Sequence, residues 1–244
     1  MLDLRKGEQY IPSGEITVKL SVVMSVFNEK ETIREILAQV RAVGMVNDLI
    51  VVDDCSTDGT REILQEEVKT DPLMMLVLHD RNCGKGAGVR SGLERFTGDI
   101  VIIQDADLEY DPRDYPMLIR PIVEGRVKVV YGSRFIGPRK DMLFLHWMGN
   151  QFLTLVTNIL FDTTLSDMET CYKVLRADVA KSLNIKSDRW GIDPEITAKV
   201  LKRGNRIFEV PISYYGREFF EGKKISWRDG LVVLWTLIKY RFVD

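Results

Sequence analysis

Cysteine, histidine and long apolar runs are scarce in this chain. It has three cysteines, Cys55, Cys83 and Cys171, with no Cys-x-x-Cys pair, and only two histidines. An odd number of widely spaced cysteines argues against a disulfide framework or a zinc site and is typical of the reducing cytosol. The N-terminal segment lacks the apolar core of a signal peptide, and no apolar run approaches the roughly 18 residues of a membrane-spanning helix. We therefore expect a cytoplasmic protein that is neither secreted nor membrane-spanning.

The chain also lacks a strong charge of either sign. It carries 34 Lys+Arg and 36 Asp+Glu, which gives a formal net charge of −2. Such a balance provides no overall attraction to nucleic acid, so nucleic-acid binding is not expected. The 244 residues are 45% hydrophobic, which is ample for a core. We expect one domain that spans residues 1–244.

The most informative stretch is IVIIQDADLEYD, residues 100–111. The segment from Ile100 to Ile103 is typical of a strand buried on both faces, and the acidic residues Asp105, Asp107 and Glu109 follow it directly. In extended backbone alternate side chains share a face, which would place the three carboxylates together. Mg²⁺ or Mn²⁺ would compensate this charge and leave positions open for substrate phosphates. The alternative is a solvated acidic turn.

Strand and helix patterns alternate through the first half of the chain. Strand patterns cover residues 18–27, 49–52, 74–79 and 100–103, while helical patterns start at residue 28, cover 61–69 and follow a glycine-rich turn at 82–88. This order predicts an α/β fold with a mostly parallel central sheet flanked by helices. Ligands of such sheets bind in the crevice at the carboxyl ends of the strands. Asn28, Asp53, Asp54 and Asp105 each follow a strand, so we expect them to converge there.

Two polar segments of the first half permit more than one interpretation. The turn NCGKGAG at residues 82–88 lacks the spacing of GxxxxGK[ST], and the chain has no GxGxxG. Its glycines serve either close packing or direct ligand contact. In DDCSTDG at residues 53–59, Asp58 or Thr57 could cap the helix near Arg61. The carboxylates that end the strand could instead accept hydrogen bonds from a nucleobase or a ribose.

Five segments in order resemble the motifs of family 2 glycosyltransferases. They are VFNE at 26–29, VVDDCSTDGT at 51–60, NCGKG at 82–86, QDADLE at 104–109 and YGSRF at 131–135. The similarity covers about residues 20 to 225, and it is strongest to the dolichol-phosphate mannosyltransferase and polyprenyl-phosphate glycosyltransferase branch. It implies a GT-A, Rossmann-like fold in which a nucleotide-sugar donor lies over the parallel sheet, with acceptor-side helices toward the C-terminus.

The resemblance implies roles for individual residues of the first half. Those implied to bind the donor are Phe27, Glu29, Asp53, Asp54, Lys85 and Asp105. Asp105 and Asp107 would serve the diphosphate and catalysis, with Asp107 and Glu109 as ligands of Mg²⁺ or Mn²⁺. Two departures stand out. Ser25 and Phe27 replace the usual proline and tyrosine, and Glu109 stands where the mannosyltransferases commonly have glutamine.

The resemblance places the acceptor side in the second half. It implies that Arg134, Arg217 and Lys224 bind the acceptor phosphate, and that Arg134 and Asp167 belong to the catalytic set. Glu169 lies beside Asp167, and either acid could be a general base or could orient a phosphate-binding cation. We expect residues 18–135 to form the nucleotide-sugar and metal half and residues 136–244 the acceptor half.

Together these features predict a metal-dependent, inverting hexosyltransferase. Its donor would be GDP-mannose or UDP-glucose, and its acceptor a polyprenyl or dolichyl phosphate. A glycosyltransferase that uses a hydroxyl acceptor, a nucleotidyltransferase and a non-catalytic nucleotide-sugar-binding subunit remain as alternatives. The nucleotidyltransferase is disfavoured because the first strand leads to Asn28-Glu29 and not to a glycine-rich signature.

Two late segments have apolar residues at helical spacing. The first stripe contains Leu145, Met148, Phe152, Leu155, Val156 and Ile159, and the second contains Trp227, Leu231, Leu234, Trp235, Ile238 and Phe242. Core packing is the default interpretation of such stripes. The second stripe, however, has two tryptophans with Arg228, Lys239 and Arg241 nearby, a composition that suits a membrane interface. We therefore expect peripheral contact with the cytoplasmic face of the membrane.

Overall fold

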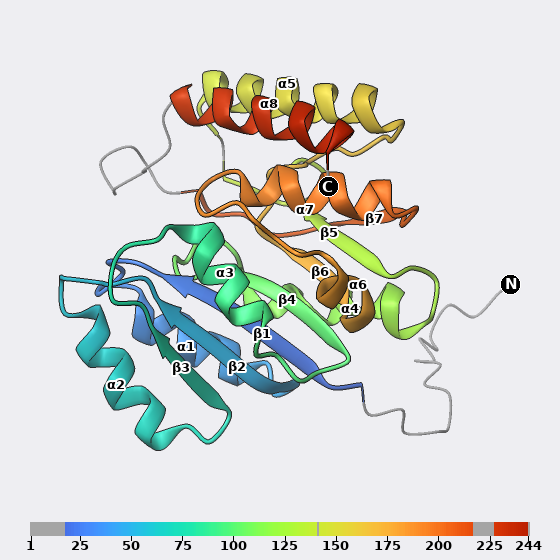
Figure 1. Ribbon diagram of the computed structural model, residues 1–244. Helices are drawn as coiled ribbons and strands as arrows, with labels where there is room; N and C mark the ends of the chain where they lie inside the picture. Colours follow the sequence, from blue (N-terminus) through green and yellow to red (C-terminus); the bar gives the residue numbers. More distant parts are fainter. Residues whose placement is uncertain (1–17, 141, 217–226, 244) are drawn as a thin grey trace, which may run out of the picture.

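A computed structural model describes residues 18–140, 142–216 and 227–243, with the backbone alone at residues 227 and 228. A seven-stranded sheet runs through both halves of the chain (Figure 1). Its order is β3 (Met74–Leu78), β2 (Val46–Asp53), β1 (Leu20–Val26), β4 (Ile100–Asp105), β6 (Lys173–Arg176), β5 (Val129–Ser133) and β7 (Ile207–Pro211). Only β6 runs antiparallel to its neighbours β4 and β5. The predicted mostly parallel sheet is confirmed, whereas the reversal at β6 had no counterpart in the sequence patterns.

Helices connect and cover these strands. They are α1 (Ile33–Ala42), α2 (Thr60–Thr70), α3 (Lys85–Leu93), the short 3₁₀ helix η1 (Pro112–Asp114), α4 (Tyr115–Val123), α5 (Phe144–Phe161), α6 (Ala177–Ser182), α7 (Ile192–Lys202) and α8 (Trp227–Phe242). Helix α3 packs on β1 and β2, and α4 packs on β5. Helices α5 and α8 lie side by side, with α7 between them and the sheet (Figure 1).

The first helix begins later than the apolar spacing predicted. Asn28 has a φ of 53°, a left-handed conformation that cannot start a helix. The chain turns through residues 28–32 before Ile33, whose N–H donates to the carbonyl of Glu29 at 2.9 Å. The turn places Asn28 and Glu29 at the carboxyl end of β1, against the neighbouring loop after β2: the N–H of Asn28 donates to Ser56 and that of Glu29 to Thr60.

The predicted glycine-rich turn is shorter than its glycine spacing suggested. It ends at Gly84, which has a φ of 97°, and α3 begins at Lys85, so Gly86 and Gly88 lie inside the helix. A Cβ at Gly86 would overlap the carbonyl oxygen of Ser187, and one at Gly88 would overlap the hydroxyl of Ser25. Close packing therefore requires both helical glycines.

Helices α5 and α8 form an outer layer whose apolar stripes are largely exposed. Leu145 is 73% exposed, Leu155 55% and Trp235 65%. The inward sides of the two helices share a small core of Leu165, Met168, Val233 and Leu237. Core packing, the default interpretation, is therefore wrong for most of the described stripe residues, although Val156 does pack against this core. No helix among the described residues combines the length and apolarity needed to cross a membrane.

A glycine substitution tests the packing of α3. Gly86→Ala should lower the free energy of unfolding by about 1–3 kcal/mol, because the added methyl meets the backbone at Ser187, which can yield only by moving the 187–188 segment. Gly149→Ala is the matched control. A Cβ at Gly149, inside α5, meets nothing within 4 Å, so this variant should gain about 0.5–1 kcal/mol in helix propensity. Urea denaturation measures both, and equal effects of the two substitutions would contradict the packing described.

Candidate active site

A cleft of about 1030 Å³ opens at the carboxyl ends of the central strands. The sheet, the loops after its strands, α5 and α8 all contribute to its walls. Of the residues singled out from the sequence, those that line it are Phe27, Glu29, Asp54, Lys85, Asp105, Asp107, Glu109, Arg134 and Glu169. Asp53 and Asp167 lie behind its surface, and Arg217 and Lys224 lie outside the described residues. The predicted convergence at one edge of the sheet is thus observed for most of the set.

The polar base of the cleft at the carboxyl ends of the strands is called its floor below. An ion pair between Lys85 and Asp105 lies on one side of this floor. The Nζ atom of Lys85, at the start of α3, lies 2.7 Å from Oδ1 of Asp105, at the end of β4. Burial alone would lower the pKa of Lys85, but the carboxylate of Asp105 raises it well above its usual value. Burial likewise favours the neutral form of Asp105, and Lys85 outweighs it, so the pKa of Asp105 is lowered. Both groups are therefore charged at neutral pH.

The acids after Asp105 reach the cleft through a turn. Strand β4 ends at Asp105, and the residues that follow bend, with the N–H of Glu109 donating to Oδ1 of Asp107 at 3.2 Å. The carboxylate of Glu109 accepts from the hydroxyl of Tyr214 at 2.8 Å. The extended backbone expected across residues 105–109 is therefore wrong, although all three acids line the same cleft.

The two aspartates at the end of β2, Asp53 within the strand and Asp54 directly after it, have different partners. Asp53 is fully buried and accepts from Nε of Arg61 at 2.6 Å and from the N–H of Ser56. Asp54 lines the cleft and accepts from the N–H groups of Cys83 and Gly84 at 2.9 and 2.6 Å. Asp54 thereby holds the glycine turn that precedes Lys85. A donor contact of Asp53 stays a prediction.

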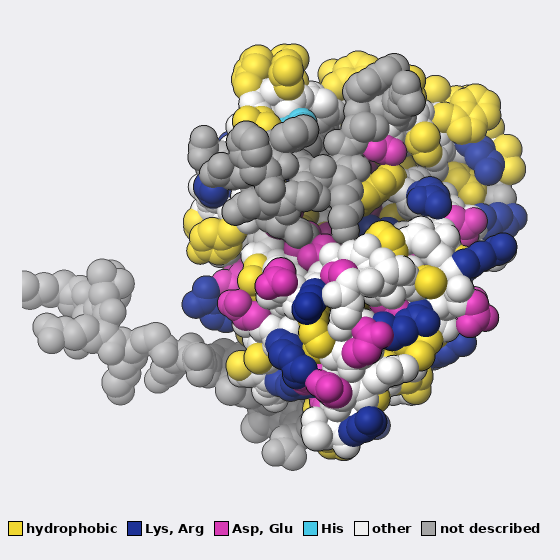
Figure 2. Space-filling model, turned by 90° about the vertical axis from the view of Figure 1, so that its left-hand side faces the viewer, with side chains coloured by type: hydrophobic (Ala, Val, Ile, Leu, Met, Phe, Trp, Pro, Cys, Tyr) yellow, Lys and Arg dark blue, Asp and Glu magenta, His cyan; other side chains and the backbone are white. Residues whose placement is uncertain are grey.

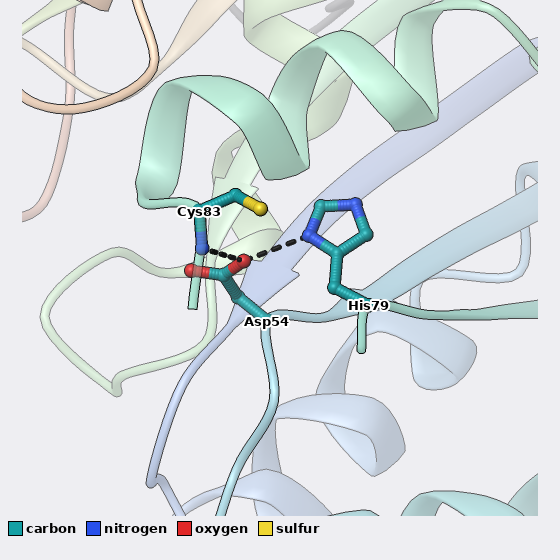
Figure 3. A group of neighbouring side chains, drawn as sticks. All are labelled: Asp54, His79 and Cys83. Carbon is teal, nitrogen blue, oxygen red and sulfur yellow. Dashed lines mark hydrogen bonds and ion pairs between the residues drawn. The ribbon is translucent and has the colours of Figure 1, made fainter. Parts of the chain in front are cut away.

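Asp54, His79 and Cys83 form the one group of three potential metal ligands found close together in the described part of the chain (Figure 3). His79 contacts Oδ1 of Asp54 through Nδ1 at 2.7 Å and the Ser91 hydroxyl through Nε2 at 2.9 Å. Both carboxylate oxygens of Asp54 already accept hydrogen bonds, so the cluster needs no ion to be satisfied. It holds loop segments together.

The predicted metal ligands Asp107 and Glu109 do not form such a compact cage with Asp105. Mg²⁺ and Mn²⁺ do not require one, since they are commonly held by one or two carboxylates together with substrate phosphates and water. Hard oxygen donors at the end of a strand, beside the cation Lys85, fit that chemistry.

On the other side of the floor, Arg134 and Asp167 form a buried two-point ion pair. Nε and Nη2 of Arg134 donate to the two carboxylate oxygens of Asp167, each at 2.7 Å, and the N–H of Arg134 donates to it as well. Nη2 also donates to Asn150 of α5 at 3.2 Å. Burial opposes the charge, yet Asp167 raises the pKa of Arg134 well above its usual value. The geometry makes Asp167 the residue that orients Arg134.

Glu169, which the sequence left as an alternative to Asp167, lines the cleft itself. Burial, reinforced by the nearby negative charge of Asp193, raises the pKa of Glu169 to about 8. Asp193 in turn is paired with the fully buried Lys173 at 2.7 Å. Sequence reasoning missed Asp193 as a wall of the cleft. The signal was its position in the first turn of α7, close to Trp190, which also lines the cleft.

The part of the cleft lined by α5 and α8 is mostly apolar. Its apolar residues include Leu145, Phe152 and Leu153 of α5 and Leu231 and Leu234 of α8, and its polar residues are His146, Asn150 and Asp229. The exposed sides of the same helices carry further hydrophobic residues, which gather at the top of the molecule in Figure 2. One cleft thus joins a charged floor to an apolar mouth.

Comparison with known proteins identifies the family. The family described as "Glycosyl transferase family 2" matches residues 21–183. The chain belongs to this family. It is 27% identical over 217 residues to the undecaprenyl-phosphate mannosyltransferase of Micrococcus luteus, covering 84% of this chain and 87% of that protein. It is 28% identical over 212 residues to the dodecaprenyl-phosphate galacturonate synthase of Rhizobium johnstonii, covering 83% of this chain but only 60% of that protein.

Solved structures with the same fold include glucosyl-3-phosphoglycerate synthase from Mycobacterium tuberculosis. Its complex with UDP has a TM-score of 0.73 and 18% identity, and the match covers 93% of this chain and 81% of that one. Its complex with Mn²⁺, UDP and phosphoglyceric acid has a TM-score of 0.69 at the same identity and covers 93% and 80%. The predicted GT-A fold of this family 2 glycosyltransferase is confirmed, as is the resemblance to polyprenyl-phosphate glycosyltransferases.

The buried ion pair of this family 2 glycosyltransferase can be tested against a surface pair of similar geometry. Asp167→Ala should cost about 3–5 kcal/mol of unfolding free energy, because Arg134 stays buried without its counter-charge. Arg176 makes an equally short two-point contact with Asp178 on the surface, at 2.6 Å for each bond. Asp178→Ala should cost less than about 1 kcal/mol. Chemical denaturation compares the two, and a small loss in both would show that the buried pair does not stabilise the fold.

Proposed function

We propose that this chain transfers one hexose, with inversion, from a nucleoside-diphosphate sugar to a polyprenyl phosphate. The observation that carries the proposal is the composition of the cleft. Its floor offers carboxylates and cations suited to a diphosphate and a phosphate, while its mouth between α5 and α8 offers mostly apolar walls suited to a hydrocarbon chain. The polyprenyl-phosphate enzymes among its relatives support the same acceptor class.

The donor side of the proposal uses the residues around β1, β2 and β4. Asp54 fixes the turn that positions Lys85, and the ion pair with Asp105 orients the ammonium group of Lys85. Phe27 and Glu29 line the adjoining wall, where the nucleoside would lie. Asp107 and Glu109 would hold Mg²⁺ or Mn²⁺, which would neutralise negative charge on the departing diphosphate.

The acceptor side uses Arg134. A phosphate oxygen is already ionised near neutral pH, so it needs a cation to place it and little help from a general base. Asp167 and Asn150 hold the guanidinium of Arg134 in one orientation within the cleft. Asp167 is therefore proposed to orient Arg134 and not to remove a proton, because both of its oxygens are occupied by the guanidinium.

Transfer itself needs one displacement. An oxygen of the acceptor phosphate forms a bond to the anomeric carbon of the sugar as the bond from that carbon to the diphosphate oxygen breaks. The electron pair leaves with the nucleoside diphosphate. Arg134 would hold the attacking phosphate, and Lys85, which also lines the cleft, would contact the leaving diphosphate. Formation of a product with retained anomeric configuration would contradict this single step.

Residues 18–135 would then form the donor half, and residues 136–244 would supply the helices of the acceptor half. The exposed apolar sides of α5 and α8 are proposed to rest on the cytoplasmic leaflet, so that the acceptor can enter the apolar mouth without its chain crossing water. GDP-mannose and UDP-glucose remain the two donors to compare.

Substitution of Asp107 tests the donor site. Asp107→Asn should abolish transfer while leaving the fold intact. It should also remove the additional thermal stabilisation that the protein gains from a bound nucleoside diphosphate when Mn²⁺ is present. Asp111→Asn is the control, since Asp111 follows in the same loop but pairs with Arg113. A ligand at 100 times its Kd adds about 2.7 kcal/mol, so a melting-curve panel of GDP and UDP with and without Mn²⁺ resolves the difference. Full activity of Asp107→Asn, or of the wild type in EDTA, would refute the metal-dependent mechanism.

Vesicle flotation tests the apolar outer layer. The wild type should bind vesicles that contain anionic lipid. Leu155→Glu and Trp235→Glu should each weaken binding by roughly tenfold or more, because each removes an exposed apolar side chain whose burial in the membrane would contribute about 1.5–3 kcal/mol of binding free energy. Leu73→Glu is matched to them, because Leu73 is also exposed, at 45%, but lies before β3, far along the sheet from this layer. Equal binding by all four proteins would exclude membrane contact through α5 and α8.

A further inference from the structure

Of the three acids Asp167, Glu169 and Asp193, two are paired with a cation. Asp167 is paired with Arg134, and Asp193 is paired with Lys173. The ammonium of Lys173 also donates to the carbonyl oxygens of Met168 and Thr170, which uses all three of its donors. Lys173 therefore has no donor to offer Glu169.

Glu169 is the third of these acids. Its Oε1 atom is buried and has no hydrogen-bond partner among the described residues, although the side chain lines the cleft. A buried polar atom without a partner destabilises the protein, and a ligand with a suitable donor would remove this cost. With its pKa raised to about 8, mainly by burial and then by Asp193, the carboxyl is mostly neutral at pH 7 and can both donate and accept.

The neighbours of Glu169 along the chain locate it within the cleft. Two residues before it, Asp167 binds Arg134, the cation proposed for the acceptor phosphate. Two residues after it, the thiol of Cys171 contacts the carbonyl oxygen of Ile103, at 3.7 Å, in the strand that ends at Asp105. Along the chain, Glu169 thus lies between the residue that binds Arg134 and the residue that contacts β4, and under the proposed function the sugar would occupy the cleft between these two ends.

We infer that Glu169 is a specificity-determining residue that forms a hydrogen bond with a hydroxyl group of the transferred hexose. The inference rests on the proposed function, since it needs a sugar in this cleft. A hydroxyl group both donates and accepts, so it matches the capacity of a neutral carboxyl. A site that hydrogen-bonds a substrate hydroxyl discriminates strongly against the analogue that lacks it, because the protein group is then left unpaired.

The test combines variants of Glu169 with deoxy forms of the donor. For wild type, Glu169→Gln and Glu169→Ala, kcat/KM is measured with the better of GDP-mannose and UDP-glucose and with its monodeoxy analogues. Binding of the nucleoside diphosphate alone is measured in parallel. Glu169→Gln has nearly the same shape and keeps one donor and one acceptor, which guards against a folding failure.

We expect one deoxy analogue to lower kcat/KM of the wild type about 100-fold. Glu169→Ala should lower kcat/KM for the intact sugar by a similar factor and should show no further loss with that analogue, because the two changes remove the same hydrogen bond. The kcat/KM of Glu169→Gln for the intact sugar should lie between those of the wild type and Glu169→Ala. Binding of the nucleoside diphosphate without the sugar should be equal in all three proteins.

Three results would overturn the inference. If every deoxy analogue lowers kcat/KM by the same factor in Glu169→Ala as in the wild type, Glu169 does not contact a sugar hydroxyl. If both variants lose nucleoside-diphosphate binding and stability together, its role is structural. If Glu169→Gln loses kcat while KM and sugar selectivity are kept, it is a general base. Failure of the wild type to bind any nucleoside diphosphate would instead refute the proposed function.

Discussion

Acidic side chains at the carboxyl edge of an apolar sheet impose the main physical constraint on this molecule. Removing a charged group from water costs several kcal/mol unless a partner compensates it. Five acids at this edge and in the adjoining segments have such a partner: Arg61 for Asp53, backbone N–H groups for Asp54, Lys85 for Asp105, Arg134 for Asp167 and Lys173 for Asp193. These pairs fix the positions of the cations, and so the places where the phosphates of the proposed reaction would bind.

The same constraint connects parts of the chain that lie far apart. The start of α3 must come close to the 187–189 segment, which only glycine at 84 and 86 permits. That segment is held in turn by Glu195, which accepts from the N–H groups of Lys186 and Ser187 and is paired with Lys199. Glu195 is therefore structural. By anchoring this segment it supports the wall that carries Trp190, beside Lys85.

A polar and an apolar environment meet in one cleft. The floor is polar because strand ends deliver charged residues to it, while the mouth is apolar because α5 and α8 turn leucine and phenylalanine side chains toward it. The helices can do this because a separate small core on their inner sides holds them to each other and to the segment around Met168. An acceptor with an ionic head and a hydrocarbon chain suits both regions at once.

The sequence by itself determined the features that are local. Alternating patterns predicted the parallel strands, and the order of short motifs predicted the family and most of the charged residues that line the cleft. Helical spacing identified the apolar stripes of α5 and α8 but could not say what covers them, because periodicity records which residues share a face and not what that face meets. The tertiary structure alone decided that the stripes are exposed, that β6 runs antiparallel, and that Asp167 orients Arg134 while Glu169 faces the cleft. Those outcomes depend on contacts between distant residues, such as the 33-residue separation of Arg134 and Asp167, and on burial, which no single segment encodes.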